Sequence, residues 1–264
     1  MEFKRSFRWQ SFLALLFILA IFGYAYSCDY NCHEYQGFMN PKYGAYNKFF
    51  RAIKGTSSAT FVMIAPLIIS LICGDSLNID RQQNMLPLFL ARIDYQKYIL
   101  KKIIALSIVG FIFVFSVLLL SYILAAFIFP YTFPVQKDQG EPWFWGDLCL
   151  AQPYFYLLIN LCIQGLIGAC FSIFALFISI LIKNRFVGLA LPWLIYLIMT
   201  VVLEMIKLGR YKPIVLAGGY LYHPYYSNQG TECLIPLCWL TFWALFSILT
   251  YICFRASFKK GRLC

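Results

Sequence analysis

Charged side chains are scarce in this chain of 264 residues: 12% are Asp, Glu, Lys or Arg, whereas 61% are hydrophobic. Soluble domains contain about 25% charged residues, so this composition excludes an ordinary soluble domain. The sequence also lacks any Gly-Lys pair. Because the phosphate-binding loop of many ATPases requires Gly-Lys followed by Ser or Thr, the chain cannot hydrolyse ATP by that route. We therefore expect a membrane protein that is not itself an enzyme.

Ionisable side chains are absent from the centres of all the long apolar runs. Ion-coupled transporters place such groups along the transport path, and intramembrane hydrolases need a nucleophile with a base or a metal. Glu204 lies at the outer end of its run, where a charge costs little. The sequence therefore predicts no catalytic residue and disfavours an ion-coupled carrier or channel.

Six runs of almost uncharged residues are long enough to consider as membrane spans: 9–26, 58–74, 103–129, 153–182, 187–205 and 234–254. A helical span needs ~20 mostly apolar residues. Run 103–129 is apolar on every face, unlike the alternating strands of a membrane barrel. We predict an all-α membrane protein with a single transmembrane domain over residues 1–264 and six transmembrane helices.

Basic residues predict the orientation. If both termini are cytoplasmic, most of the 22 Lys and Arg residues lie on the cytoplasmic side, as the positive-inside rule requires. The net charge of +11 then concentrates on one membrane face, where anionic lipid headgroups explain it, so we expect no nucleic-acid partner. A signal peptide cleaved before Cys28 is the alternative for the first run. Its apolar stretch is long for a signal peptide, and we prefer an uncleaved span.

The ten cysteines do not indicate a metal centre. Most lie in or near the spans, where cysteine usually serves as a small hydrophobe. Cys28 and Cys32 fall in the first outer loop, where a disulfide is one interpretation. A zinc site that adds His33 is a weaker one. We predict no metal ligands.

Small residues recur along one face of the fourth span, at spacings of three and four: Gly165, Gly168, Ser172, Ala175 and Ser179. Such a stripe lets another helix approach closely, either within one bundle or at the seam of a dimer. Asn160 and Gln164 precede it by about one turn. These two polar side chains either line a path or hold helices together.

The pattern of segment 40–55 in the first outer loop predicts an amphipathic helix. Basic residues alternate with apolar ones along the segment. The apolar residues that share one helical face are Tyr43, Tyr46, Phe49, Phe50 and Ile53. This pattern predicts an interfacial helix that lies on the outer leaflet and is anchored there by its aromatic side chains, and a surface that gathers substrate is the alternative.

The stretch 74–102, between the second and third spans, contains eight charged residues, and leucines lie among them. Placing eight charges in hydrocarbon would cost on the order of 20 kcal/mol, so the stretch must leave the bilayer. It resembles the same region of type-2 ABC exporter permeases, which has an acidic-basic pair, a leucine run, Ser-Arg-Pro, a tyrosine and a closing lysine. The matching positions are Asp80, Arg81, Leu86 to Leu90, Ala91, Arg92, Tyr98 and Lys102. Departures from the pattern occur at Asn84, Met85, Pro87 and Ile93.

This resemblance implies a short cytoplasmic coupling helix that docks on a separate ATP-binding subunit, which would hold ATP and Mg. The residues implied in coupling are Asp80, Arg81, Leu86, Leu88, Phe89, Leu90 and Arg92. It also implies a second permease protomer, identical or paralogous, in a bacterial plasma membrane. We expect export of an amphipathic peptide, a lipid-like molecule or a drug. A membrane immunity or scaffold protein that does not transport is the alternative.

Overall fold

The computed structural model describes residues 9–31, 44–54, 60–74, 76–83, 85–129, 148, 151–182, 184–206 and 234–259. Within these ranges the chain forms helices joined by short turns and contains no strand. Five helical stretches among the described residues are long and apolar enough to cross a membrane: Met63–Gln82, which combines two successive helices, Tyr95–Ile128, Pro153–Leu181, Phe186–Leu203 and Pro236–Lys259. A shorter apolar helix covers Phe12–Tyr24, within the first predicted run. The prediction of an all-α, multi-pass membrane protein is therefore confirmed for the described residues.

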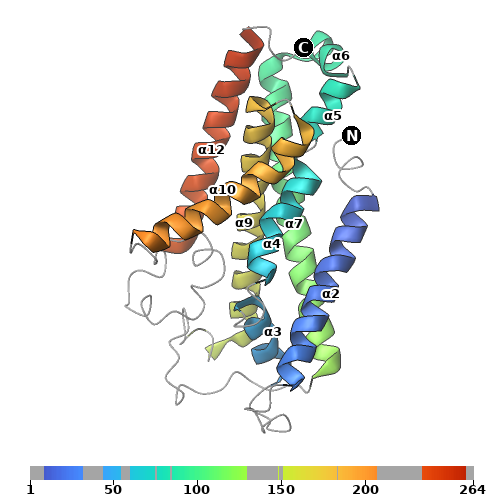
Figure 1. Cartoon of the computed structure of the whole chain (residues 1–264), viewed down its shortest axis with the longest axis vertical. Helices are drawn as coiled ribbons and strands as arrows, with labels where there is room; N and C mark the ends of the chain where they lie inside the picture. The colour runs from blue at the N-terminus through green and yellow to red at the C-terminus, as the bar shows by residue number, and fades with distance from the viewer. Residues whose placement is uncertain are drawn as a thin grey trace.

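The helices follow one another along the chain as α2 (Trp9–Asn31), α3 (Ala45–Lys54), α4 (Thr60–Cys73), α5 (Ser76–Gln82), α6 (Met85–Arg92), α7 (Tyr95–Ile128), α9 (Pro153–Leu181), α10 (Arg185–Met205) and α12 (Leu234–Lys259). The long helices run roughly along one axis, except α10, which crosses the bundle at a steep slant (Figure 1). The short helices α5 and α6 lie at one end of the bundle, and α3 lies toward the other end.

Three helix boundaries differ from the predicted spans by five residues or more. Helix α7 begins at Tyr95, well before residue 103. Helix α2 continues to Asn31, past residue 26, and α12 continues to Lys259, past residue 254. The prediction stopped at charged residues because charges are costly in a bilayer. The helical backbone continues past that limit, so the first turns of α7 extend beyond the apolar run.

Helix α9 is the centre of the bundle. Of its 29 residues, 20 are buried, and it contacts α4, α7, α10 and α12. It starts with Pro153 in its first turn, where the missing amide hydrogen of proline costs nothing. Because α9 touches so many other helices, a residue fixed to α9 is fixed to the core of the molecule.

Apolar side chains cover much of the outer surface of the bundle. Large exposed hydrophobic residues are distributed over α2, α7, α10 and α12, and include Phe12, Leu16, Ile104, Ile108, Leu194, Ile198, Leu245 and Ile248. An aqueous surface does not carry so many exposed apolar side chains, whereas lipid acyl chains accommodate them. This distribution agrees with a bundle that sits in a bilayer.

Helix α3 does not present its aromatic face to the outer leaflet, so the prediction of a lipid-facing interfacial helix is wrong for this face. Phe49 and Phe50 are fully buried, and Phe49 packs edge-on against Tyr122 of α7 at 5.4 Å between ring centroids. The Tyr46 hydroxyl donates a hydrogen bond to the carbonyl oxygen of Pro153 at 3.3 Å. The amphipathic pattern gave the face correctly, but protein rather than lipid covers it. Tyr43 falls outside the described residues.

Candidate functional site

The stretch singled out in the sequence forms two short helices and the first turns of a long one. Helix α5 follows α4 after a turn in which the amide of Gly74 donates to the carbonyl of Ser70 at 2.8 Å. Helix α6 ends where the amide of Ile93 donates to the carbonyl of Phe89, and Asp94 then caps the start of α7 through its backbone carbonyl. These turns place α5, α6 and the start of α7 together at one end of the bundle (Figure 1).

A buried ion pair joins α5 to α7. The side chains of Asp80 and Lys102 are each 1% exposed, and the Lys102 ammonium donates to the Asp80 carboxylate. The Tyr98 hydroxyl also donates to Asp80 Oδ2 at 2.8 Å, and Lys102 Nζ lies 3.1 Å from the Tyr98 hydroxyl oxygen and 3.3 Å from the carbonyl oxygen of Ser76. Burial of two charges is tolerated when they pair and their remaining hydrogen-bonding groups are satisfied. This cluster fixes α5 against α7.

Arg81, the next residue of α5, points toward a different helix. Its Nη1 donates to the carbonyl oxygen of Ser179 on α9 at 2.7 Å. The Ser179 hydroxyl donates in turn to the carbonyl oxygen of Gly74 at 2.6 Å, at the end of α4. A hydrogen bond from a charged donor is worth about 1.5–3 kcal/mol, so this contact ties α5 firmly to the central helix.

Helix α6 separates its apolar residues into an inner and an outer set. Leu86 is 1% exposed, whereas Leu88 is 65% exposed. Phe89 is half-buried and stacks on Tyr98, with ring centroids 6.1 Å apart. Arg92 is exposed and lies four residues after Leu88, on the same face of the helix. The exposed face of α6 therefore presents a leucine beside an arginine.

The residues predicted as one contact surface thus divide into two groups. Asp80 and Leu86 are buried and present no surface to a partner in this conformation, and Arg81 is committed to Ser179. Leu88 and Arg92 face outward. The side chain of Leu90 falls outside what the structure describes. The inner group fixes α5 and α6 against the bundle, and the outer group forms the surface that is accessible to a partner.

Sequence reasoning assigned no role to Tyr98 and Lys102, although both matched the family pattern. One signal was available: the two residues are four apart, so they share a helix face at the entrance to an apolar run. A charged residue at such a position normally has a partner. The sequence could not identify that partner as Asp80, because the pairing depends on the turn between α4 and α5.

The small-residue stripe of α9 packs inside the chain. A Cβ on Gly168 would lie 2.6 Å from the carbonyl oxygen of Gly110 on α7, and a Cβ on Gly165 would lie 2.8 Å from the ring of Phe111. Ser172, Ala175 and Ser179 are fully buried. Of the two interpretations of the stripe, close packing between α9 and its neighbours within one chain is the one that the contacts support. Any dimer seam would need a different surface.

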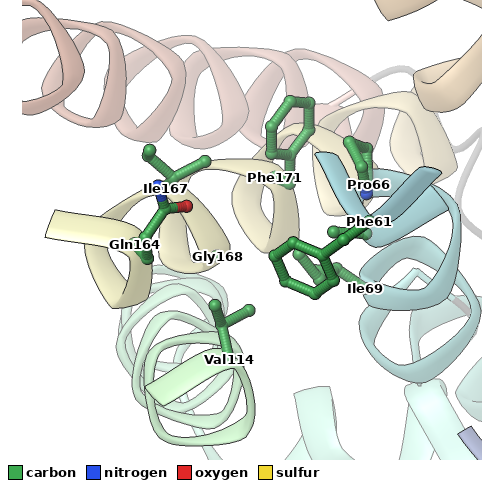
Figure 2. A pocket seen from close by; sticks show the side chains of 9 residues that line it. Phe61, Pro66, Ile69, Val114, Gln164, Ile167, Gly168 and Phe171 are labelled. Carbon is green, nitrogen blue, oxygen red and sulfur yellow. The ribbon is translucent and has the colours of Figure 1, made fainter. Parts of the chain in front are cut away.

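The two polar residues that precede the stripe are also buried in α9. Asn160 Nδ2 donates to the carbonyl oxygen of Tyr156 on its own helix at 3.0 Å. Gln164 borders a small cavity between α4, α7 and α9 with a volume of about 20 Å³ (Figure 2). The other lining residues are Phe61, Ala65, Pro66, Ile69, Val114, Ile167, Gly168 and Phe171. A cavity of this size holds about one water molecule, whereas small-molecule sites measure roughly 300 Å³ or more.

No cluster of three His, Cys, Asp or Glu side chains that could bind a metal occurs among the described residues. Cys32 and His33, and the side chains of Cys28 and Glu204, fall outside that part of the chain. The sequence matches no model of a known protein family, and no curated protein matches it. Residues and geometry alone therefore carry the functional interpretation.

Proposed function

We propose that the chain is the transmembrane permease subunit of a bacterial ATP-driven exporter. In this proposal α2 completes a set of six spans, both termini are cytoplasmic, and α6 is the coupling helix that docks on a separate ATP-binding subunit. ATP and Mg would bind that partner, not this chain. The resemblance of residues 80–102 to type-2 ABC exporter permeases supports the proposal.

The observation that carries the proposal is that α6 exposes side chains to a partner, while the neighbouring helix α5 is held firmly against the bundle. Leu88 and Arg92 project from α6, while the adjoining α5 is fixed to α7 by the Asp80–Lys102 pair and to α9 by Arg81. A helix that transmits a partner's movement must contact the partner through exposed side chains. It must also be attached firmly to the membrane helices, so that they move with it. An idle connecting loop would need neither property.

Coupling to ATP follows from differential binding. If the ATP-bound partner fits one arrangement of the bundle better than another, it shifts the population toward that arrangement by the difference in binding free energy. A tenfold shift requires about 1.4 kcal/mol. Helix α5 packs on α6 and α9, and the Asp80–Lys102 pair joins α5 to α7, so a displacement of α6 can reach two long helices.

A second permease protomer is part of the proposal because the resemblance to type-2 ABC exporter permeases implies one. The cavity bordered by Gln164 admits about one water molecule and is too small for the proposed substrate. A path for an amphipathic peptide, a lipid-like molecule or a drug would form between two protomers. The exposed apolar faces of α2, α10 and α12 offer surfaces on which the protomers could meet. The second protomer is either identical or paralogous.

The test is to co-purify the chain with an ATP-binding protein, sought first among the products of the neighbouring genes, and to compare Leu88→Asp and Arg92→Glu with the wild type. The matched control is Gln152→Asp, which places a carboxylate at an exposed position at the start of α9. We expect both α6 variants to lose complex formation and stimulated ATP hydrolysis, and the control to retain both. Leu88 is a sharper probe than Phe89, because Phe89 also stacks on Tyr98.

Retention of the complex and of stimulated hydrolysis by both α6 variants would refute docking through α6. A wild-type chain that binds no ATP-binding protein, but still confers resistance to a toxic peptide, would point to the non-transporting immunity or scaffold role. Transport without any ATPase partner would point to an ion-coupled carrier or channel.

A further inference from the structure

The end of the bundle that carries α6 also exposes an excess of positive charge. Five described basic side chains are exposed there: Arg92, Lys97, Lys101, Arg255 and Lys259. Among the described acidic side chains at this end, Asp94 is exposed and lies 3.6 Å from Lys97, while Asp80 is buried against Lys102. Asp94 offsets one of these five charges, so the exposed charge at this end remains predominantly positive among the described residues.

Aromatic contacts bring the end of α12 into this region. The rings of Tyr95 on α7 and Phe258 on α12 stack with centroids 4.8 Å apart. One turn further into the bundle, Tyr98 and the fully buried Phe254 lie 5.9 Å apart. These contacts hold the last turns of α12, with Arg255 and Lys259, beside the first turns of α7. The end of α12 and α6 lie at the same end of the molecule (Figure 1).

The exposed residues occur in pairs four apart on three helices, so each pair lies on one helix face. Leu88 pairs with Arg92 on α6, Lys97 with Lys101 on α7, and Arg255 with Lys259 on α12. We call these six residues the basic face. It consists of one exposed leucine and five cations, presented by α7 and by α6 and α12, each of which packs against α7.

We propose that the basic face docks on an acidic protein surface, in which an apolar pocket receives Leu88 and carboxylates around it face the cations of α6, α7 and α12. This inference rests on the proposed function and extends it in two respects. It adds the end of α12 as a second docking element, and it states the charge of the partner's surface. Complementary charge of this kind fixes orientation and accelerates association.

A partner protein explains the face better than a layer of anionic lipid headgroups. Headgroups would attract the cations, but they have no pocket for Leu88, which stands exposed beside Arg92. Helices that insert into a membrane surface present a broad apolar face. On α6, by contrast, Leu86 is buried and Phe89 stacks on Tyr98, so little apolar surface remains for insertion.

The experiment takes the ATP-binding protein used in the co-purification test above and measures its binding to the full-length chain in nanodiscs of phosphatidylcholine, a lipid without net charge. The variant Arg255→Gln with Lys259→Gln removes two charges from α12. The control, Gln152→Asp, adds a negative charge at an exposed position at the start of α9, outside the basic face. We expect the neutralised variant to raise Kd about tenfold and the control to leave Kd within about twofold of the wild type. We also expect the wild-type Kd to rise about tenfold between 50 and 300 mM NaCl, because salt screens exposed charges.

The outcomes separate the two proposals. If the wild type binds, Leu88→Asp abolishes binding, and neither α12 neutralisation nor salt changes Kd, then docking through α6 stands and the acidic-partner inference is overturned. The same conclusion holds if α12 neutralisation matters only in nanodiscs that contain anionic phosphatidylglycerol, because the cations then serve the lipid. If the wild type does not bind at all, the proposed function fails and the inference fails with it.

Discussion

Removal of one partner of the Asp80–Lys102 pair should destabilise the protein strongly. The two side chains are each 1% exposed, and Tyr98 contributes a further hydrogen bond to the carboxylate. Lys102→Met leaves a buried carboxylate without its counter-charge, and Asp80→Leu leaves a buried ammonium. Breaking such a pair on one side costs about 3–5 kcal/mol. We expect each single variant to lower the free energy of unfolding by that amount.

The double variant Asp80→Leu with Lys102→Met removes both charges at once. Replacement of a buried ion pair by apolar residues is often neutral or stabilising, so the double variant should be more stable than either single one. The coupling energy from the double-mutant cycle should exceed about 2 kcal/mol. The measurement is reversible denaturation of the purified chain in detergent, followed by tryptophan fluorescence.

A second Lys–Asp pair on the same helix provides the control. Lys97 and Asp94 lie 3.6 Å apart, but their side chains are 72% and 75% exposed. An exposed pair contributes about 0.3 kcal/mol, because water and salt screen it and both side chains lose entropy. Lys97→Met should therefore leave stability almost unchanged. Additive single variants of Asp80 and Lys102, or a Lys102→Met effect as small as that of Lys97→Met, would refute the assignment of a buried, charge-paired anchor.

Two further predictions concern packing, and each has an internal control. Gly110→Ala places a methyl group 1.8 Å from Ser172 Oγ, which forces α7 and α9 apart and should lower the free energy of unfolding by about 1–3 kcal/mol. The control is Gly23→Ala, whose methyl group has nothing within 4 Å and which should be neutral or slightly stabilising. Thermal unfolding of both variants in detergent measures this difference, and equal melting temperatures would contradict the close contact. Phe49→Ala empties a fully buried position and should lower the free energy of unfolding by about 3–5 kcal/mol, whereas Phe12→Ala, at a side chain that is 51% exposed, should cost far less. Equal losses in denaturation would show that α3 does not pack as described.

The sequence was sufficient to predict the helical class and the positions of most spans. Long apolar runs specify membrane helices almost directly, because hydrocarbon requires every backbone polar group to bond within its own helix. Helix α9 (Pro153–Leu181) matches its predicted run within a residue. Helix α7 begins at Tyr95, and this was not predicted, because Lys97 and Lys101 are charged and the prediction followed hydropathy. Charged residues mark where a helix leaves the hydrocarbon region, but they do not mark where the helix itself begins or ends.

Helix α3 shows what periodicity leaves undetermined. The spacing of Tyr46, Phe49 and Phe50 correctly identified an apolar face. Periodicity cannot tell whether lipid or protein covers such a face, because both are apolar. Here Phe22 of α2 and Tyr122 of α7 cover it, and they come from segments remote in the sequence. Only the three-dimensional arrangement of the helices decides between a lipid anchor and an internal packing element.

The same limitation explains the division of the candidate coupling residues. Asp80 and Arg81 are adjacent, and the family pattern treats them as one acidic-basic pair. Adjacent residues on a helix point about 100° apart, so they reach different neighbours: Asp80 reaches Lys102 on α7, and Arg81 reaches the carbonyl of Ser179 on α9. A displacement of α5 must therefore either move α7 and α9 with it or break a buried charged contact that is worth several kcal/mol. Under the proposed function, the cost of breaking these contacts would make α7 and α9 move with α5 when a partner docks on α6.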